Sequence, residues 1–369
     1  DYFEIDRHFG DKEVFRNLVE ESHKRGIKIM LDAVFNHIGY QSAQWQDVLK
    51  NGEKSPYKDW FHIQEFPVTE DKLQNPRQLP YHTFAFASYM PKLNTANPEV
   101  RDYLLSVATY WIENFDIDAW RLDVANEIDH QFWKDFRKAV LAKKSDLYIL
   151  GEIWHTSQPW LQGDEFHAVM NYPLSESIKD YFLRQRKKTE QFISEINSQS
   201  MYYKQQISEV MFNLLDSHDT ERILTTAKGN IQHVKAALTF LYLQKGAPCI
   251  YYGTELELIG GPDPDCRRVM PWDRVSEDND MLNFMKQLIQ LRKEVASIIQ
   301  HGSYSLEEVK PDVLALKWSH EGKEVQVIFN QSTENYILDR DSVDLTSHCQ
   351  MENGQYVILK DGFVIYISE

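Results

Sequence analysis

The chain has 369 residues, of which 42% are hydrophobic and 13% aromatic, so it is long enough for one large domain and a smaller one. Its formal net charge of −16 argues against a nucleic-acid partner, because contact with phosphates needs clustered Lys and Arg. No apolar stretch approaches the ~20 residues that span a bilayer, and 3 scattered cysteines are too few for a disulfide framework. We therefore expect a cytoplasmic protein that binds neither nucleic acid nor membranes.

Helix-like and strand-like segments alternate along the chain as far as Gly302. Amphipathic segments that predict helices cover residues 11–25, 98–114 and 129–144. Short apolar runs that predict strands cover residues 27–34, 117–124, 147–152, 168–172, 211–215 and 248–252. Repeated βα units of this kind imply a parallel sheet.

Two regions interrupt the alternation. The segment between His37 and Asn97 shows no clear helical period and is rich in aromatic residues and Pro, and an insertion of that length after a strand predicts a functional excursion. After Gly302, short alternating runs such as 313–318 and 324–329 predict a small antiparallel β domain.

Four predicted strands end in a carboxylate. They are the segments LDAVFNH (31–37), WRLD (120–123), ILGE (149–152) and LLDSHD (214–219). A charge at the end of a buried run is costly unless it is paired or used, and strand ends carry the catalytic groups of a (β/α)₈ barrel. A carboxylic acid and a carboxylate on either side of a glycosidic bond are what glycoside hydrolysis uses. The pattern therefore favours a glycoside hydrolase.

The same segments carry a family resemblance. DAVFNH (32–37), WRLDVANE (120–127), GEIWH (151–155) and LLDSHD (214–219) resemble, in order and spacing, the four signature segments of the α-amylase family, and MPKLN (90–94) resembles a fifth. WRLDVANE and MPKLN are typical of the branch that contains neopullulanase, maltogenic amylase and cyclomaltodextrinase. The resemblance runs over essentially the whole chain.

The resemblance implies an α/β fold with a (β/α)₈ barrel at 1–37 and 98–301. It also implies an inserted domain B at 38–97, after the third strand of the barrel, and a C-terminal β-sandwich domain at 302–369. Only six of the eight barrel strands are recognised, so we expect the N-terminal strands, with the N-terminal β domain usual in this branch, to belong to a longer protein. Because that domain helps to form dimers, we expect the full-length form to be a homodimer.

Carried over residue by residue, the resemblance implies Asp123 as nucleophile, Glu152 as general acid/base and Asp219 as the carboxylate that grips the distorted sugar. The substrate-binding residues that it implies are His37, Arg121, His218, Asp265 and Arg267, with Trp154 as a candidate to stack on sugar or exclude water. Asp32 matches a structural carboxylate near Arg121. Arg121 precedes Asp123 by two residues, so both side chains should leave the strand on one face and the guanidinium should keep the carboxylate ionised.

Taken singly, these residues also fit ordinary structural roles. Arg121 with Asp123 fits a buried ion pair, His218 fits a satisfied core histidine, and Glu152 fits a cap on the following segment. The aromatic residues of the insertion fit either a core or a substrate groove; these are Phe84, Phe86 and Tyr89. We favour catalysis because all four strand-end segments occur together.

The activity that the resemblance implies is retaining hydrolysis of α-1,4 bonds in an α-glucan oligosaccharide partner: cyclomaltodextrins, pullulan or starch oligosaccharides, with some transfer to sugar acceptors. Two alternatives stay open, an oligo-α-1,6-glucosidase-like enzyme and a catalytically incomplete glucan-binding fragment. We expect no required cofactor. Asn36 matches one calcium ligand of calcium-binding α-amylases, but the other ligands are not evident, so we predict no metal site there.

Overall fold

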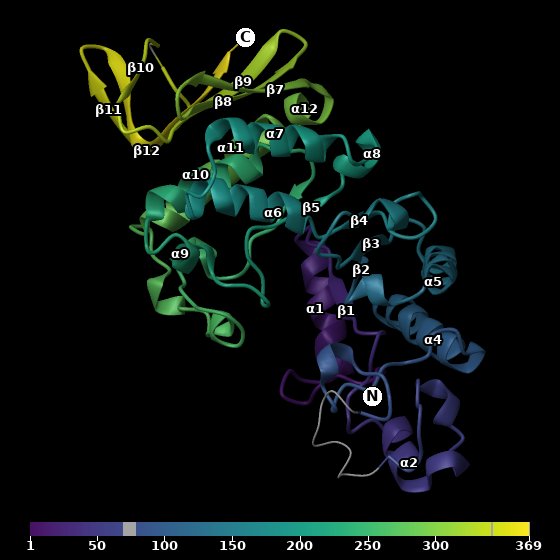
Figure 1. The fold of residues 1–369 in the computed structure, drawn as a ribbon. Coiled ribbons are helices and arrows are strands. Elements are labelled where there is room, and N and C mark those ends of the chain that lie inside the picture. The colour runs from purple at the N-terminus through teal and green to yellow at the C-terminus, as the bar shows by residue number, and fades with distance from the viewer. Residues whose placement is uncertain (69–78, 341, 369) are drawn as a thin grey trace. The chain divides into compact units, whose positions relative to one another are not determined.

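The computed structural model describes residues 1–68, 79–340 and 342–368, which form two compact units (Figure 1). The first unit comprises Asp1–Ile153 and Ser157–Val169, and the second comprises Trp154–Thr156 and Met170–Glu369. Residues 69–78 of the predicted inserted domain lie outside the described residues. Every helix of the described part is too short or too polar to span a bilayer.

The first unit is built on a parallel four-stranded sheet in the order β1-β2-β3-β4. Its strands are β1 (Met30–Ala33), β2 (Ala119–Leu122), β3 (Tyr148–Gly151) and β4 (Ala168–Val169). Asp32 pairs in register with Arg121, which pairs with Leu150. The predicted parallel strands are therefore present, although each is shorter than its apolar run.

Helices cover this sheet where the amphipathic segments predict them. Asp11, Asn97 and Asp129 cap the N-termini of α1 (Lys12–Lys24), α4 (Pro98–Phe115) and α5 (His130–Lys143), each accepting a hydrogen bond from a first-turn N–H. The loops that follow β2 and β3 contain the short 3₁₀ helices η5 (Ala125–Glu127) and η6 (Gln158–Trp160). These caps place each helix start within a residue or two of its prediction.

The segment between His37 and Asn97 contains a helix that its sequence pattern does not reveal. α2 (Ala43–Asn51) begins after Ser42, whose hydroxyl accepts a hydrogen bond from Trp45 N–H, and it buries only Trp45 and Val48. Short 3₁₀ helices follow at η1 (Gly52–Lys54), η2 (Lys58–Trp60) and η4 (Phe84–Phe86). A helix with two buried residues leaves too short an apolar period to recognise.

The second unit contains a two-stranded parallel sheet, β5 (Phe212–Asn213) and β6 (Ala247–Pro248), among helices. The helices are α6 (Tyr172–Ile178), the π-helix η7 (Lys179–Leu183), α7 (Thr189–Ser200), α8 (Gln205–Ser208), α9 (Ile223–Thr226), α10 (Ile231–Tyr242), η8 (Thr254–Leu256), η9 (Asp265–Arg267), η10 (Trp272–Arg274), α11 (Asp280–Glu294) and α12 (Ala296–His301). The strand predicted at 168–172 is too long, because Tyr172 already begins α6.

An antiparallel sheet of six strands ends the chain, which confirms the predicted antiparallel β domain. The strands are β7 (Ser303–Lys310), β8 (Val313–His320), β9 (Lys323–Asn330), β10 (Tyr336–Leu338), β11 (Leu345–Glu352) and β12 (Gln355–Ser368). Alternate residues of β8 face two apolar clusters: Leu314 and Leu316 lie in the cluster shared with α10 and α11, and Val313 and Ala315 lie in the other.

Candidate active site

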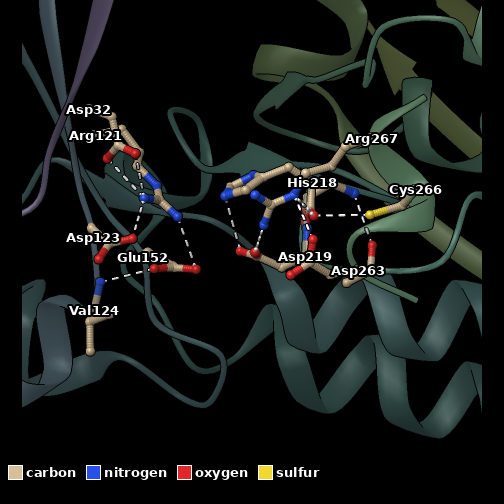
Figure 2. A network of polar contacts seen from close by, with 12 residues as sticks. Asp32, Arg121, Asp123, Val124, Glu152, His218, Asp219, Asp263, Cys266 and Arg267 are labelled. Carbon is tan, nitrogen blue, oxygen red and sulfur yellow. Dashed lines mark hydrogen bonds and ion pairs between the residues drawn. The ribbon is translucent and has the colours of Figure 1, made fainter. Parts of the chain in front are cut away.

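Arg121 lies among three carboxylates at the ends of neighbouring strands. Its Nη1 donates to Oδ1 and Oδ2 of Asp32 at 2.8 and 2.9 Å and to Oδ1 of Asp123 at 2.7 Å (Figure 2). Its Nη2 lies 3.0 Å from Oε1 of Glu152. Because β1, β2 and β3 are parallel and in register, the carboxylates of Asp32, Asp123 and Glu152 reach the same guanidinium.

Three of the four side chains in this arginine cluster are largely shielded from water, whereas the fourth, Asp32, is 48% exposed. The side chains of Arg121 and Glu152 are 9% and 6% exposed, and that of Asp123 is 19% exposed. Burial by itself would lower the pKa of Arg121, but the charges of Asp32, Glu152 and Asp123 outweigh it and raise that pKa above its ordinary value. Arg121 therefore carries a positive charge at any working pH and faces two carboxylates of the kind that glycoside chemistry needs.

A backbone donor also holds Glu152. Its Oε2 accepts a hydrogen bond from Val124 N–H at 2.9 Å (Figure 2). Its own N–H donates to the Leu122 carbonyl at 2.9 Å. Val124 has φ +46°, which is a strained conformation for a β-branched residue and costs about 1–3 kcal/mol. Strain of this kind concentrates at functional sites, and here it lies between Asp123 and the loop that follows.

His37 follows β1 on the same unit, and its ring stacks on Phe84 with centroids 5.0 Å apart and 9° between the planes. Burial lowers the pKa of His37, and the charges of Asp123 and Glu127 oppose the shift without cancelling it. The imidazole is therefore neutral near pH 7 and suited to hydrogen bonding rather than to charge. Of the other predicted groove aromatics, Phe86 and Tyr89 are exposed.

The Lys92 ammonium lies beside Asn36, the residue that matches a calcium ligand of calcium-binding α-amylases. It donates to Asn36 Oδ1 and, at 3.0 Å, to the carbonyl oxygen of Glu127, and it lies 3.5 Å from Glu127 Oε2. The Lys92 ammonium thus already supplies a positive charge at this position. Asn36 and Glu127 therefore do not fit a divalent metal ion in addition to Lys92. Among the described residues there is also no group of three or more His, Cys, Asp or Glu side chains arranged to hold a metal ion.

We expect Lys92→Met to lower the free energy of unfolding by about 1–3 kcal/mol, because Asn36 and Glu127 would lose a charged hydrogen-bond donor. A chelator such as EDTA should leave the Tm of the unmodified protein unchanged. Thermal unfolding with and without chelator measures both effects. A chelator-induced drop in Tm, reversed by added calcium, would contradict the assignment of the cation to Lys92.

The second unit carries its own cluster of predicted residues around Asp219. Asp219 Oδ1 lies 3.2 Å from Arg267 Nη2, and Asp219 Oδ2 lies 3.2 Å from His218 Nε2 (Figure 2). Arg267 Nε also donates to the His218 carbonyl at 2.9 Å, and so does the thiol of Cys266 at 3.0 Å. The structure therefore brings His218, Asp219 and Arg267 together, as the sequence predicts.

Asp265 is not part of this cluster. Its carboxylate accepts two hydrogen bonds from Arg268, each at 2.9 Å, and one from Gly261 N–H at 2.7 Å. Besides Asp219, the carboxylate that contacts Arg267 is that of Asp263, with Oδ1 2.8 Å from Nε (Figure 2). Asp265 therefore contacts Arg268 and Gly261, and Arg267 contacts Asp263 of the same loop.

Arg222 forms hydrogen bonds to the loops around residues 252, 260 and 266, close in sequence to Asp263, Asp265 and Arg267. It is fully buried, donates from Nε to the Cys266 carbonyl at 2.8 Å and from Nη1 to the Tyr252 carbonyl, and its N–H donates to the Gly260 carbonyl at 3.0 Å. Its guanidinium lies 3.8 Å from the centroid of the Tyr251 ring. The sequence contains no signal that distinguishes this arginine from an exposed one.

Asp216 supports the same segment from within the core. Its Oδ2 accepts hydrogen bonds from Ile223 N–H at 3.0 Å and from the Thr254 hydroxyl at 3.4 Å. Burial raises the pKa of Asp216 to about 6, and these hydrogen bonds only partly offset the effect.

We expect Asp216→Asn to stabilise the protein at neutral pH. A carboxyl whose folded-state pKa is raised binds its proton more tightly in the folded state, so stability falls as pH rises from about 4 to about 6. The full shift corresponds to about 3 kcal/mol. The stability difference between variant and unmodified protein, from urea unfolding at pH 4 to 7, should grow toward that value. A pH-independent difference, as expected for the exposed control Asp146→Asn, would contradict it.

The indole ring of Trp154 stacks on the ring of Tyr172. Trp154 is 48% exposed and Tyr172 is 2% exposed, and their ring centroids lie 4.0 Å apart with planes 8° from parallel. A buried ring that supports an exposed ring makes a rigid flat surface, which suits the apolar face of a sugar. The predicted site residues did not include Tyr172, Val124, Lys92 or Asp263. Lys92 lies within the segment MPKLN, and the start of α6 at the segment NYP is a local hint at Tyr172.

Comparison with known proteins places the chain in a family. Residues 1–302 match the family described as "Alpha amylase, catalytic domain". The intracellular maltogenic amylase of Bacillus subtilis is 54% identical over 333 residues, 90% of this chain and 55% of the relative. Neopullulanase 2 of Thermoactinomyces vulgaris is 48% identical over 299 residues, 81% of this chain and 50% of the relative. A solved cyclomaltodextrinase structure superimposes with a TM-score of 0.89 at 42% identity, covering 100% of this chain and 65% of that one.

The chain thus spans about half the length of the curated relatives that it matches. The match to the catalytic domain nevertheless covers most of its residues, including every predicted site residue. The chain belongs to the α-amylase family of glycoside hydrolases, in the branch of maltogenic amylase, cyclomaltodextrinase and neopullulanase.

Proposed function

We propose that the protein is a retaining α-glucan hydrolase that cleaves α-1,4 bonds in cyclomaltodextrins, pullulan and starch oligosaccharides. The observation that carries the proposal is the arginine cluster. Asp123 and Glu152 flank one guanidinium at 2.7 and 3.0 Å, shielded from water, on neighbouring strand ends. Retaining enzymes need two carboxyl groups only ~5 Å apart, whereas inverting enzymes need room for a water molecule between them. Two carboxylates on one guanidinium suit the shorter spacing.

In the proposed reaction Asp123 attacks the anomeric carbon while Glu152 gives its proton to the leaving glycosidic oxygen. The C–O bond to the leaving sugar breaks and an ester to Asp123 forms. Glu152 then takes a proton from water, whose oxygen attacks the same carbon and releases Asp123. Transfer to sugar acceptors follows if a sugar hydroxyl replaces that water. No cofactor enters either step.

The other predicted residues have proposed roles around this chemistry. Asp219 would stabilise the distorted sugar through charge that matters most in the transition state. His37 and His218 would hydrogen-bond sugar hydroxyls, and Trp154 on Tyr172 would stack on a sugar ring. Arg267, held by Asp263, and Asp265 on the same loop would also contact the substrate.

The finer organisation of the protein is also proposed. Residues 1–37 and 98–301 would form the catalytic barrel, 38–97 an inserted domain B and 302–369 a C-terminal β-sandwich. A relative named an intracellular maltogenic amylase supports a cytoplasmic location. We propose a homodimer for the full-length form, with an α-glucan oligosaccharide as the partner of the active site.

A product assay on β-cyclodextrin, pullulan and soluble starch tests the proposal. We expect maltose from cyclodextrin and starch and panose from pullulan, with α-anomers released first because two displacements retain configuration. Selective cleavage of α-1,6 bonds would favour the oligo-α-1,6-glucosidase alternative. Glucan binding without turnover would contradict hydrolysis and favour the glucan-binding alternative.

A further inference from the structure

The second unit contains a cavity that none of the proposed catalytic or substrate-binding residues lines. Its volume is about 460 Å³, within the range of small-ligand pockets. It lies where the C-terminal turn of α7 and the segment up to α8 approach β7 and β8, which lie close together in Figure 1. Gly302, at the start of the C-terminal sheet, also lines it.

Aromatic rings form part of the cavity wall. Tyr304 on β7 and Trp318 on β8 are a cross-strand pair with ring centroids 4.7 Å apart. Tyr202 and Tyr203, between α7 and α8, line the same cavity, and Tyr202 is exposed to solvent. Rings at a pocket mouth and in its wall offer flat apolar surfaces to a ligand.

Polar side chains form another part of the cavity wall. Gln199 donates from Nε2 to the Ser177 hydroxyl at 2.9 Å and to the Pro173 carbonyl at 3.3 Å, but its buried Oε1 accepts no hydrogen bond from the described residues. The hydroxyl of Tyr304 is also buried and lies near Gln244. Amide and hydroxyl groups of this kind in the wall suit a ligand that carries hydroxyl groups of its own.

The charged and neutral groups of the cavity lining indicate which class of ligand fits the cavity. Lys245 is its single charged residue, and its ammonium lies 5.6 Å from the centroid of the Trp318 ring. The remaining lining is aromatic, aliphatic, amide or hydroxyl, with no carboxylate. A neutral ligand with many hydroxyl groups and apolar ring faces matches this lining better than a cation or an apolar molecule does.

We propose that this cavity is a second carbohydrate-binding site that takes a short α-glucan such as maltotriose. The choice of an α-glucan rests on the proposed function, whereas the preference for a neutral sugar rests on the lining alone. The site would hold products or chain ends. The tyrosine rings would face the sugar ring, and the amide and hydroxyl groups of the wall would hydrogen-bond its hydroxyl groups.

Calorimetric titration with maltotriose tests the proposal. The protein carries Asp123→Asn throughout, so that ligand is not consumed. We expect two classes of site, one of which weakens about tenfold in Tyr202→Ser, because serine removes the flat aromatic ring that would stack on the sugar. The control is Met201→Ser, an adjacent exposed residue outside the cavity lining, which should bind as the parent does.

A second variant guards against misfolding. Lys245→Met removes the charged donor from the wall and should weaken the same class of site, while circular dichroism confirms the fold of each variant. A single class of site, insensitive to both changes, would overturn the second site. Hydrolysis by the protein with Asp123 intact is measured in parallel with binding. If glucan is hydrolysed but only one class of binding site is found and neither variant affects it, the second site is wrong and the proposed function stands. If binding depends on Tyr202 but no glucan is hydrolysed, the second site is supported and the proposed function is wrong.

Discussion

Replacement of Asp123 by Asn should lower kcat for β-cyclodextrin hydrolysis by about 10⁴-fold or more, because an amide cannot form the ester on which the second displacement depends. Binding should change little, since Asn keeps the size of the side chain and an oxygen that can still accept from Arg121. Steady-state kinetics of reducing-sugar release measure the loss, and equilibrium binding of β-cyclodextrin measures the retained affinity.

Two controls separate the nucleophile from general damage. Asp102→Asn changes an exposed carboxylate and should leave kcat unchanged. Glu152→Gln should hydrolyse α-maltosyl fluoride, whose leaving group needs no proton, far better than it hydrolyses β-cyclodextrin, whereas Asp123→Asn should fail on both. Substantial turnover by Asp123→Asn on the fluoride would remove Asp123 from the role of nucleophile.

Replacement of Arg121 by Met should lower the free energy of unfolding by about 3–5 kcal/mol, because the buried carboxylate of Glu152 and the largely buried one of Asp123 would lose their counter-charge. Urea unfolding at pH 7 measures the loss.

Arg121→Lys should recover part of this stability but little activity. A lysine supplies one point charge, whereas the guanidinium contacts three carboxylates with two terminal nitrogens and holds them in a fixed plane. Arg101→Met, which breaks a surface pair with Asp102, should cost at most about 1 kcal/mol. A loss of similar size at both arginines would mean that the arginine cluster carries no special stabilisation.

Parts of the site follow from local pattern and were predictable. Asp123 and Glu152 end apolar runs, and a parallel sheet places such strand ends along one edge, so their approach to Arg121 needed only the strand assignment. Helix starts were equally local, because Asp11, Asn97 and Asp129 cap the helices that follow them.

Other parts depend on backbone conformations and long-range contacts that no local pattern encodes. The N–H of Val124 reaches Glu152 because Val124 has a left-handed backbone conformation, which β-branched residues rarely adopt. Asp263 contacts Arg267, whereas Asp265 contacts Arg268. α2 has too few buried residues to show its period.

The sequence by itself determined the alternation of helices and strands, the order of the strand-end carboxylates and the family, because these rest on apolar period, capping residues and short motifs. Only the tertiary structure decided which carboxylate faces which cation, that Lys92 supplies a positive charge beside Asn36, and that Gln199, Tyr304 and Trp318 line one cavity. The physical reason is that hydrogen bonds and burial join residues far apart in the chain, and their energies depend on geometry rather than on neighbours in sequence.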